Sequence, residues 1–179
     1  GCTGVPVHCD LARVTKVVVD LGNKNDTLDA SAVQVLLDVD AGSGDDDLTT
    51  GSHADQVDLG SGDDSIDGGD GDDVIDGETG VDFIHGQKGD DVLFGGDDAD
   101  RVWGGSGDDR GYGDAGGDLV FGNAGQDQLY GQDGADVVEG NNGSDRGSGG
   151  DGGDVLYGGT RAAGRDDARE LGQYALGIG

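Results

Sequence analysis

The sequence predicts an all-β fold, a parallel β-solenoid in which two nine-residue units make one flattened coil and both ends are capped. Residues 41–157 divide into thirteen consecutive units of nine residues without an insertion. The sixth position is Asp in every unit, and the eighth is aliphatic in eleven of the thirteen. A short period with one fixed acid and one fixed apolar residue is typical of a solenoid, whose repeats stack on their neighbours.

Each unit is expected to contain a turn followed by a short strand. In the unit Gly68–Asp76, glycines stand at the first, second and fourth positions. Glycine there favours a tight turn with positive φ. The last three residues are typical of a strand in which only Ile75 points inward. Two units, eighteen residues, therefore close one coil with a strand on each side, and coils stack at about 4.8 Å.

The eighth positions form the predicted core. They are Leu48, Val57, Ile66, Ile75, Ile84, Leu93, Val102, Gly111, Val120, Leu129, Val138, Gly147 and Leu156. Gly111 and Gly147 break the rule, and each follows an outward Arg, at 110 and 146. A narrowed core, a salt bridge to the acidic surface and a recurring contact face remain alternatives for these two units.

The sixth positions are the candidate metal ligands. They are Asp46, Asp55, Asp64, Asp73, Asp82, Asp91, Asp100, Asp109, Asp118, Asp127, Asp136, Asp145 and Asp154. Successive units alternate between the two edges of the coil, so each edge becomes a ladder of carboxylates one coil apart. Unpaired carboxylates about 5 Å apart repel by roughly 1 kcal/mol or more, so a cation between them is expected. Carboxylates and turn carbonyls are hard oxygen donors that suit Ca²⁺ better than Mg²⁺, which demands a small octahedron.

These units resemble the RTX (repeats-in-toxin) calcium-binding nonapeptide of right-handed parallel β-roll proteins, over about two-thirds of the chain. The resemblance implies that each ion lies between two turns stacked at one edge, held by sixth-position Asp side chains and turn carbonyls. Asp64 would then pair with Asp82, and Asp73 with Asp91. Seven turns at one edge have six intervals between them, and six turns at the other edge have five. With one ion in each interval, about eleven Ca²⁺ ions are expected.

Several units depart from this pattern, and the sites that use them are expected to be weaker or altered. The fourth-position Gly is replaced by His53 and Asp98, and the second position carries Glu78, Gln87, Asp114, Asn123, Gln132 and Asn141.

Residues 1–40 are predicted to be an N-terminal cap with a modified first coil. Strands are expected at 17–21, 25–29 and 33–39, and Asp26 copies a sixth position although it lies twenty residues before Asp46. Asp26 is therefore a further candidate ligand. Cys2 and Cys9 are expected to form a disulfide, which indicates an extracellular or cell-surface setting. A metal cluster of Cys2, His8 and Cys9 is the alternative.

Residues 158–179 are predicted to be a C-terminal cap or tail. Arg161, Arg165 and Arg169 stand among Ala, Asp and Glu, followed by a stretch with Leu171, Tyr174 and Leu176. A short helix at 166–171 and a cap that packs on the last coil are both compatible with this composition.

The ninth positions face outward and change along the chain. They are polar from Thr49 to His85, and then become Phe94, Trp103, Tyr112, Phe121, Tyr130, Glu139, Ser148 and Tyr157. On alternate faces the rings are expected to stack as Phe94–Tyr112–Tyr130 and as Trp103–Phe121. They either cover bare glycine backbone or form an exposed stripe that contacts a partner or another copy.

Composition narrows the function classes. The net charge of −29 excludes nucleic acid as a natural partner, no apolar run is long enough for a membrane span, and no catalytic motif is present. Without calcium, so acidic a chain is expected to be disordered. The sequence therefore predicts a non-enzymatic, secreted calcium-binding structural protein. The alternatives are a calcium-dependent self-assembling filament, surface-layer or adhesion protein, and the repeat domain of a larger secreted hydrolase or toxin.

Overall fold

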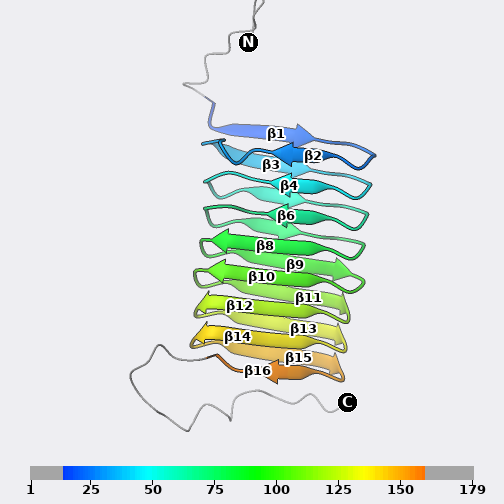
Figure 1. Cartoon of the computed structure of the whole chain (residues 1–179), viewed down its shortest axis with the longest axis vertical. Coiled ribbons are helices and arrows are strands. Elements are labelled where there is room, and N and C mark those ends of the chain that lie inside the picture. Colours follow the sequence, from blue (N-terminus) through cyan, green and yellow to red (C-terminus); the bar gives the residue numbers. More distant parts are fainter. Residues whose placement is uncertain (1–13, 160–179) are drawn as a thin grey trace, which may run out of the picture.

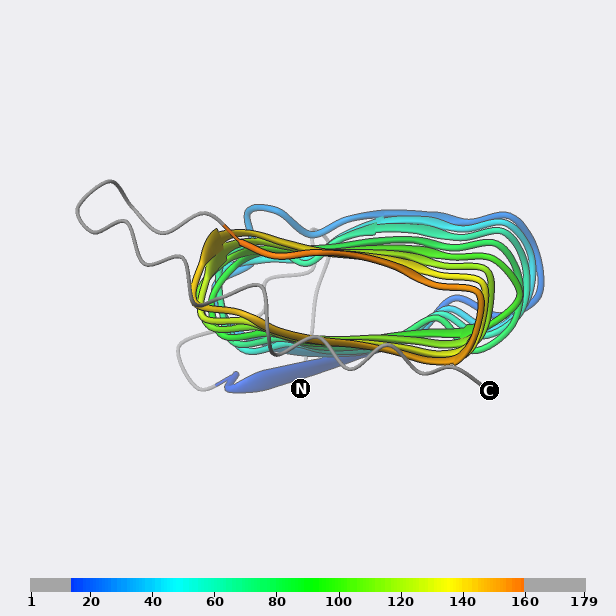
Figure 2. The same ribbon diagram turned by 90° about the horizontal axis from the view of Figure 1, so that it is seen from below.

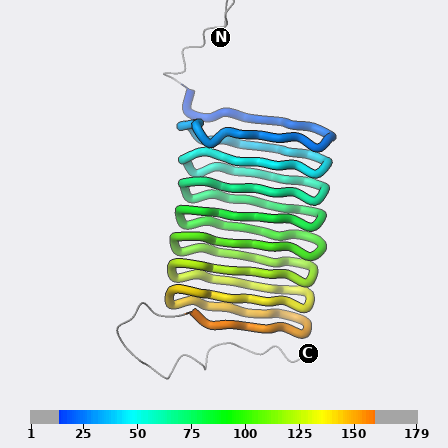
Figure 3. The backbone as a smooth tube through the Cα atoms, viewed as in Figure 1, coloured from blue at the N-terminus to red at the C-terminus, as the bar shows by residue number. Residues whose placement is uncertain are grey.

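Two parallel sheets face each other across a thin core in the computed structural model, which describes residues 14–159 (Figure 1). Seen along the stack, the coils superpose as one flattened ring (Figure 2). The tube in Figure 3 shows them stacked from the N-terminal to the C-terminal end. The predicted all-β solenoid with two units per coil is confirmed. The proposed Cys2–Cys9 disulfide, His8 and the possible helix at 166–171 lie outside the described residues.

The chain alternates between the sheets, so odd-numbered strands make one sheet and even-numbered strands the other. The odd sheet contains, in spatial order, β1 (Lys16–Asp20), β3 (Leu36–Asp40), β5 (Gln56–Asp58), β7 (Val74–Asp76), β9 (Val92–Asp97), β11 (Arg110–Gly116), β13 (Gln128–Gly134) and β15 (Arg146–Gly152). The even sheet contains β2 (Thr27–Asp29), β4 (Asp47–Thr49), β6 (Ser65–Asp67), β8 (Phe83–Lys88), β10 (Arg101–Ser106), β12 (Leu119–Gly125), β14 (Val137–Gly143) and β16 (Val155–Tyr157).

Residues one coil apart are direct partners, as the ninefold period predicts. Leu48 pairs with Ile66, and Ile66 pairs with Ile84, eighteen residues on. The first coil is two residues longer, because Leu28 pairs with Leu48 and Val17 with Leu37. The two extra residues lie between β2 and β3. There Ser31 donates from its amide and hydroxyl to Asp29, and the Val33 amide donates to the Ala30 carbonyl.

Strand bounds differ from the prediction at several strands. β1 covers Lys16–Asp20 rather than 17–21, and β2 begins at Thr27 rather than at residue 25. β3 begins at Leu36 rather than at residue 33, because the inserted turn occupies the preceding residues. β8 to β15 have six or seven residues rather than three, since they continue through the start of the next unit. Position-two residues there keep pairing in register, as Gln87 does with Gly105.

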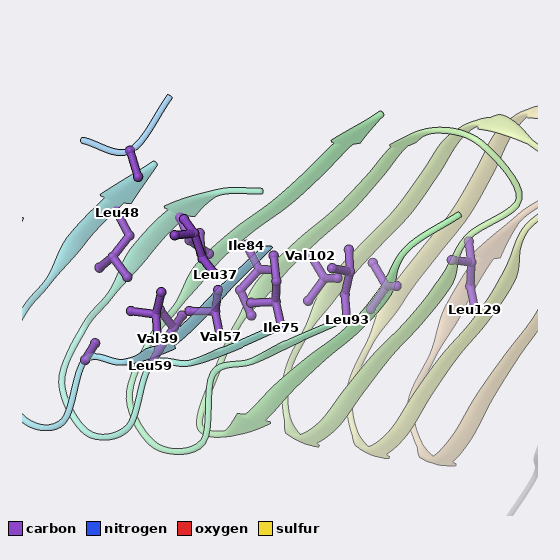
Figure 4. Packing of buried hydrophobic residues seen from close by; sticks show 14 of the residues in the cluster. Leu37, Val39, Leu48, Val57, Leu59, Ile75, Ile84, Leu93, Val102 and Leu129 are labelled. Carbon is purple, nitrogen blue, oxygen red and sulfur yellow. The ribbon is translucent and has the colours of Figure 1, made fainter. Parts of the chain in front are cut away.

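The core is a file of aliphatic side chains contributed alternately by the two sheets, and Leu37, Val39 and Leu59 widen it near the N-terminal end (Figure 4). Every predicted aliphatic from Leu48 to Val138 is at most 2 % exposed, and Leu156 packs partly buried at the end. Gly111 leaves no hole, because a Cβ placed there would lie 3.0 Å from Val120 Cγ1 and 3.3 Å from Leu129 Cδ2. The core narrows at this point, which supports the first of the three alternatives for this unit.

The predicted ring stacks are present on the outer faces. On the odd sheet, Tyr112 stacks on Phe94 and Tyr130 with centroid distances of 4.9 and 5.1 Å. On the even sheet, Trp103 stacks on Phe121 at 5.8 Å. These rings are half-buried, so they cover neighbouring backbone while still meeting solvent. Contact of these rings with a partner or another copy, which was the second reading, stays a prediction.

Candidate metal centre

The sixth-position Asp residues stand directly before the strands, at the turns that join the two sheets. Eleven of them, from Asp46 to Asp136, are at most 2 % exposed, whereas Asp26, Asp145 and Asp154 are half-buried. Those at one edge precede even strands and those at the other precede odd strands. The topology therefore brings the predicted residues together as two ladders.

Within each ladder, one carboxylate oxygen holds the neighbouring coil. The Asp46 amide donates to Asp64 Oδ1 at 2.7 Å, and the Asp73 amide donates to Asp91 Oδ1 at 2.8 Å. The same bond recurs down to Asp154 Oδ1, which accepts from the Asp136 amide at 3.2 Å. It therefore fixes each carboxylate at the junction of two successive turns.

The ladders also extend into the modified first coil. The Asp26 amide donates to Asp46 Oδ1, and the Leu37 amide donates to Asp55 Oδ1, each at 2.7 Å. Asp26 therefore continues one ladder, as its sequence position suggested. Leu37 occupies the equivalent place in the other ladder without supplying a carboxylate.

The second carboxylate oxygen of most of these residues is buried and has no hydrogen-bond partner among the described residues. This applies to Oδ2 of Asp46, Asp64, Asp73, Asp82, Asp91, Asp100, Asp109, Asp118, Asp127 and Asp136. Asp55 differs, because its Oδ2 accepts the Gly51 amide at 3.2 Å. An unpaired buried oxygen is costly and needs a partner that the chain itself does not provide.

Glycine at the first position makes room for this oxygen. A Cβ on Gly86 would lie 2.2 Å from Asp91 Oδ2, and one on Gly77 would lie 2.6 Å from Asp82 Oδ2. Such distances are far inside van der Waals contact. In these units only glycine leaves room for the carboxylate five residues later, whereas Ala41, Thr50 and Leu59 occupy the first position of the three N-terminal units.

Burial alters the acidity of the ladder. Desolvation raises the pKa of Asp73 and Asp82 against the opposing effect of the amide bond, and neighbouring carboxylates raise it further. The pKa reaches about 6 at Asp64, Asp91 and Asp118, and about 7 at Asp73, Asp82, Asp100, Asp109 and Asp127. The charged form is therefore disfavoured in the fold unless a cation compensates it.

Second-position residues bring the carbonyls of adjacent turns close together. A Cβ on Gly60 or Gly69 would lie 2.1 Å from the carbonyl oxygen of Gly42 or Gly51, one coil earlier. Residues that replace glycine keep the positive φ that the turn requires, namely Glu78, Gln87, Asp98, Asp114, Asn123, Gln132 and Asn141, whereas His53 does not adopt it. The substituted turns thus retain the backbone shape, at the expense of local strain.

The donor set suits a hard cation that shares its ligands between coils. Within residues 14–159, no three His, Cys, Asp or Glu side chains gather closely enough to hold a metal by themselves. A site must therefore combine carboxylates from two stacked turns with backbone carbonyls, and Ca²⁺ accepts such all-oxygen sets of 6 to 8 ligands. The buried Oδ2 atoms and the glycine-lined space beside them fit this group.

A further set of acids was not recognised in the sequence. Fifth-position Asp side chains accept the amide of the equivalent residue one coil later: Asp45 from Asp63, Asp63 from Val81, Asp72 from Asp90, Asp90 from Asp108, and Asp108 from Gln126. They are exposed and act as caps for the turns. The fifth position is Ala54 or Val81 in other units, so the period alone carried no signal for this role.

The sequence matches the family described as RTX calcium-binding nonapeptide repeat (4 copies) at residues 38–66, 49–84, 76–111, 112–147 and 139–160. No curated protein matches the chain. Among the described residues, no helix has the length and apolar character that crossing a membrane would require.

Proposed function

Because the chain belongs to the RTX calcium-binding nonapeptide repeat family, we propose that it is a secreted structural protein whose β-roll forms when extracellular Ca²⁺ binds. The observation that carries this proposal is the row of buried Asp Oδ2 atoms without a hydrogen-bond partner. One aliphatic side chain per nine residues makes a thin core, and a net charge of −29 opposes compaction. Calcium would offset this charge, so binding and folding become one event.

Consecutive carboxylates at each edge are the proposed ligands. Asp64 and Asp82 would share an ion at one edge, and Asp73 and Asp91 at the other, with turn carbonyls completing the sets. About eleven such intervals follow from the two ladders. Bound calcium would supply positive charge between coils and link each turn to the next.

The pKa shifts give the pH dependence of the calcium-free chain. An ordinary Asp has a pKa near 3.8, and the folded values at Asp73 and Asp82 are about 7. A raised folded pKa stabilises the fold below the unfolded value, and this contribution is lost as pH rises through about 7. At neutral pH the chain without calcium should therefore be unfolded, and protons should compete with calcium at mildly acid pH.

Circular dichroism of the whole chain with calcium and with excess chelator tests the proposal. The expected result at pH 7.5 and low salt is a β-rich spectrum only in calcium, with calorimetry giving a stoichiometry of several ions per chain. A β-rich spectrum that persists in excess chelator would contradict coupled folding and binding.

Calcium-dependent self-assembly is a second candidate, favoured by the ends of the solenoid. Within residues 14–159, β15 and β16 have strand partners on one side only, and Tyr157 on β16 is 53 % exposed. Such edges pair readily with other strands, and head-to-tail contacts between unlike ends lead to filaments. Light scattering and electron microscopy across a calcium series test this, and a monomeric rod at every concentration would reject it.

A further inference from the structure

A groove lies on the outer face of the even sheet, away from the edges that carry the Asp ladders. Its volume is about 590 Å³, and its lining comes from β4, β6, β8, β10 and β12. This is within the range of about 300–1,000 Å³ in which small-molecule sites fall. None of the thirteen sixth-position Asp residues lines it.

Two columns of outward side chains form its walls. Asp47, Ser65 and Phe83 follow one another in register on β4, β6 and β8, and Thr49, Asp67 and His85 do so beside them. The floor is the strand backbone at Leu48 and Ile66, whose side chains belong to the core. The groove therefore runs across successive strands along the solenoid axis.

Aromatic rings line the C-terminal half of this groove, which continues to Gly105 and Asn123. Phe83 is 46 % exposed, and its ring lies 4.9 Å from that of Trp103 between centroids. The Arg101 guanidinium lies over the Phe83 ring, 5.1 Å from its centroid. Arg101 follows Phe83 in the column and does not line the groove, which lies on the side of Ser65 and Asp47. This is the one cation–π contact among residues 14–159, and Phe83 still lines the groove.

Carboxylates set the charge of the groove. Asp67 accepts a hydrogen bond from Gln87 Nε2 at 2.8 Å and lies 3.2 Å from His85 Nδ1. Asp47 is exposed and makes no ion pair within residues 14–159. With two carboxylates in the lining and a strongly acidic chain around it, the groove repels anions and attracts cations.

We propose that this groove binds an organic cation, with an ammonium or guanidinium head near Asp47 and Asp67 and an apolar stem against Phe83 and Trp103. An aromatic face attracts a cation held over it, and desolvation by the walls strengthens the attraction. A small inorganic ion would gain only the charge and not the contact with the rings. The head group could belong to a free polyamine or to an Arg or Lys side chain of a basic peptide.

Trp103 is the single tryptophan of the chain and lies in the groove, so its fluorescence reports on binding directly. We would titrate the calcium-saturated full chain, at fixed calcium and salt, with spermidine in one arm and a capped tetra-arginine peptide in the other. A saturable change in either arm is expected, and the arm that responds identifies the source of the cation. No saturable change in either arm would overturn the proposal.

Matched variants separate the groove from general attraction to an acidic protein. Phe83→Leu should weaken binding by roughly 2- to 30-fold, since a cation–π contact is worth about 0.5–2 kcal/mol. Asp47→Asn should weaken it too, because it removes the carboxylate that faces the cationic head. Asp58→Asn and Tyr112→Leu make the same kinds of change on the odd sheet and should leave the affinity unchanged. Equal weakening by Asp58→Asn and Asp47→Asn would reveal non-specific charge attraction and overturn the proposal.

The remaining controls concern the fold and the ligand class. Circular dichroism and the calcium concentration at the midpoint of folding verify that each variant folds. If Phe83→Leu fails to fold, Asp47→Asn still tests the proposal, because Asp47 is exposed and its substitution should not disturb the fold. A neutral oligosaccharide that binds as tightly as the cations, with no loss in Asp47→Asn, would also overturn the proposal. Failure of cation binding in a chain that still folds on calcium leaves the proposed calcium function intact.

Discussion

The polar half of the repeat (residues 41–76, with β4 to β7) and the ring half (residues 83–152, with β8 to β15) share one interior but differ outside. Both contain the buried Asp ladder and the aliphatic file. On the odd sheet, the ninth-position column is Asp40, Asp58 and Asp76 in the N-terminal part, and then Phe94, Tyr112 and Tyr130. The same strand register therefore aligns like charges in one half and stacked rings in the other.

The common register beneath different outer columns indicates that the interior determines the register, and we expect the outer columns to influence how strongly neighbouring coils bind each other. In the polar half, burial and the charges of Asp76, Asp40 and Asp38 raise the pKa of Asp58, so ionisation there opposes folding. In the ring half, each stacked pair contributes about 0.5–1.5 kcal/mol beyond the burial of its area. The polar half should consequently depend more on calcium than the ring half.

Stepwise removal of calcium should give the largest separation of the two halves. We expect amide protection in β4 to β7 to be lost at a calcium concentration roughly tenfold or more above that for β8 to β14, because three stacked ring pairs stabilise the latter. Hydrogen exchange with mass spectrometry across a calcium series measures this. Coincident loss in all peptides would mean that the outer columns have no influence.

Loss of one ladder carboxylate should cost somewhat less. Asp136→Ala removes the acceptor of the Asp118 amide, 2.9 Å away, and should lower the free energy of unfolding in calcium by about 2–3 kcal/mol. Asp133→Ala is the control, since it removes an exposed carboxylate from the end of β13, in the same nine-residue unit as Asp136. Asp64→Ala, in the polar half, should cost at least as much as Asp136→Ala. Urea unfolding at fixed calcium decides, and equal stability of the Asp133 and Asp136 variants would argue against the ladder.

Removal of the central ring of a stack should have an intermediate effect. Tyr112→Leu loses contacts with both Phe94 and Tyr130 and should cost about 1–2 kcal/mol. The calcium concentration at which β9 to β13 lose half of their amide protection should then approach the value for the polar half. An unchanged midpoint in hydrogen exchange would show that the stacks do not stabilise the coils.

Neutralising the acidic column should stabilise the polar half slightly. Asp58→Asn relieves repulsion from Asp40 and Asp76 and should gain roughly 0.5–1 kcal/mol at pH 7 and low salt. In the unmodified chain, acidification through the raised pKa of Asp58 should produce part of the same gain, since a raised folded pKa favours the fold as pH falls. The variant should lose that part of the pH dependence in thermal melts, and a destabilised variant would contradict this account.

The smallest expected effect concerns backbone strain between the two halves. Glu78 is exposed and has φ 66°, a conformation that glycine adopts without penalty. Glu78→Gly should raise the free energy of unfolding by up to about 1 kcal/mol. Gln132→Gly should gain less, since the Gln132 amide group donates to Asp114 and that bond would be lost. Urea unfolding measures both variants, and a larger gain in the free energy of unfolding for Gln132→Gly than for Glu78→Gly would contradict this account.

Much of the fold could be predicted because one period fixed both the hydrogen-bond partners and the buried positions. Pairing at eighteen residues, the buried file from Leu48 to Val138, the ring stacks and the twenty-residue offset at Asp26 are confirmed. Strand length was wrong for β8 to β15, since glycine-rich segments gave no strand signal. Their pairing comes from the neighbouring coil and not from local propensity.

The candidate site was predicted in part. The two ladders followed from the alternation of units. The different roles of the two carboxylate oxygens could be seen only in the structure, where Oδ1 accepts an amide of the neighbouring coil and Oδ2 is buried without a partner. The groove on the even sheet was not predicted, because it depends on Phe83, at a seventh position, meeting Trp103 at a ninth. The ninefold period relates residues at the same position in successive units. It therefore does not predict a contact between residues at different positions, such as Phe83 and Trp103.

The hydrogen bond from each sixth-position amide always points to the coil that follows in sequence, so the solenoid has a polarity that bears on the order in which its coils form. The Asp73 amide finds its acceptor in Asp91, and the Asp91 amide finds its acceptor in Asp109, always eighteen residues later. If the proposed calcium-driven folding begins at the N-terminal end, each coil is completed only when the following coil has joined it. The growing end then lacks one set of acceptors until Asp154, the acceptor of the Asp136 amide, is in place.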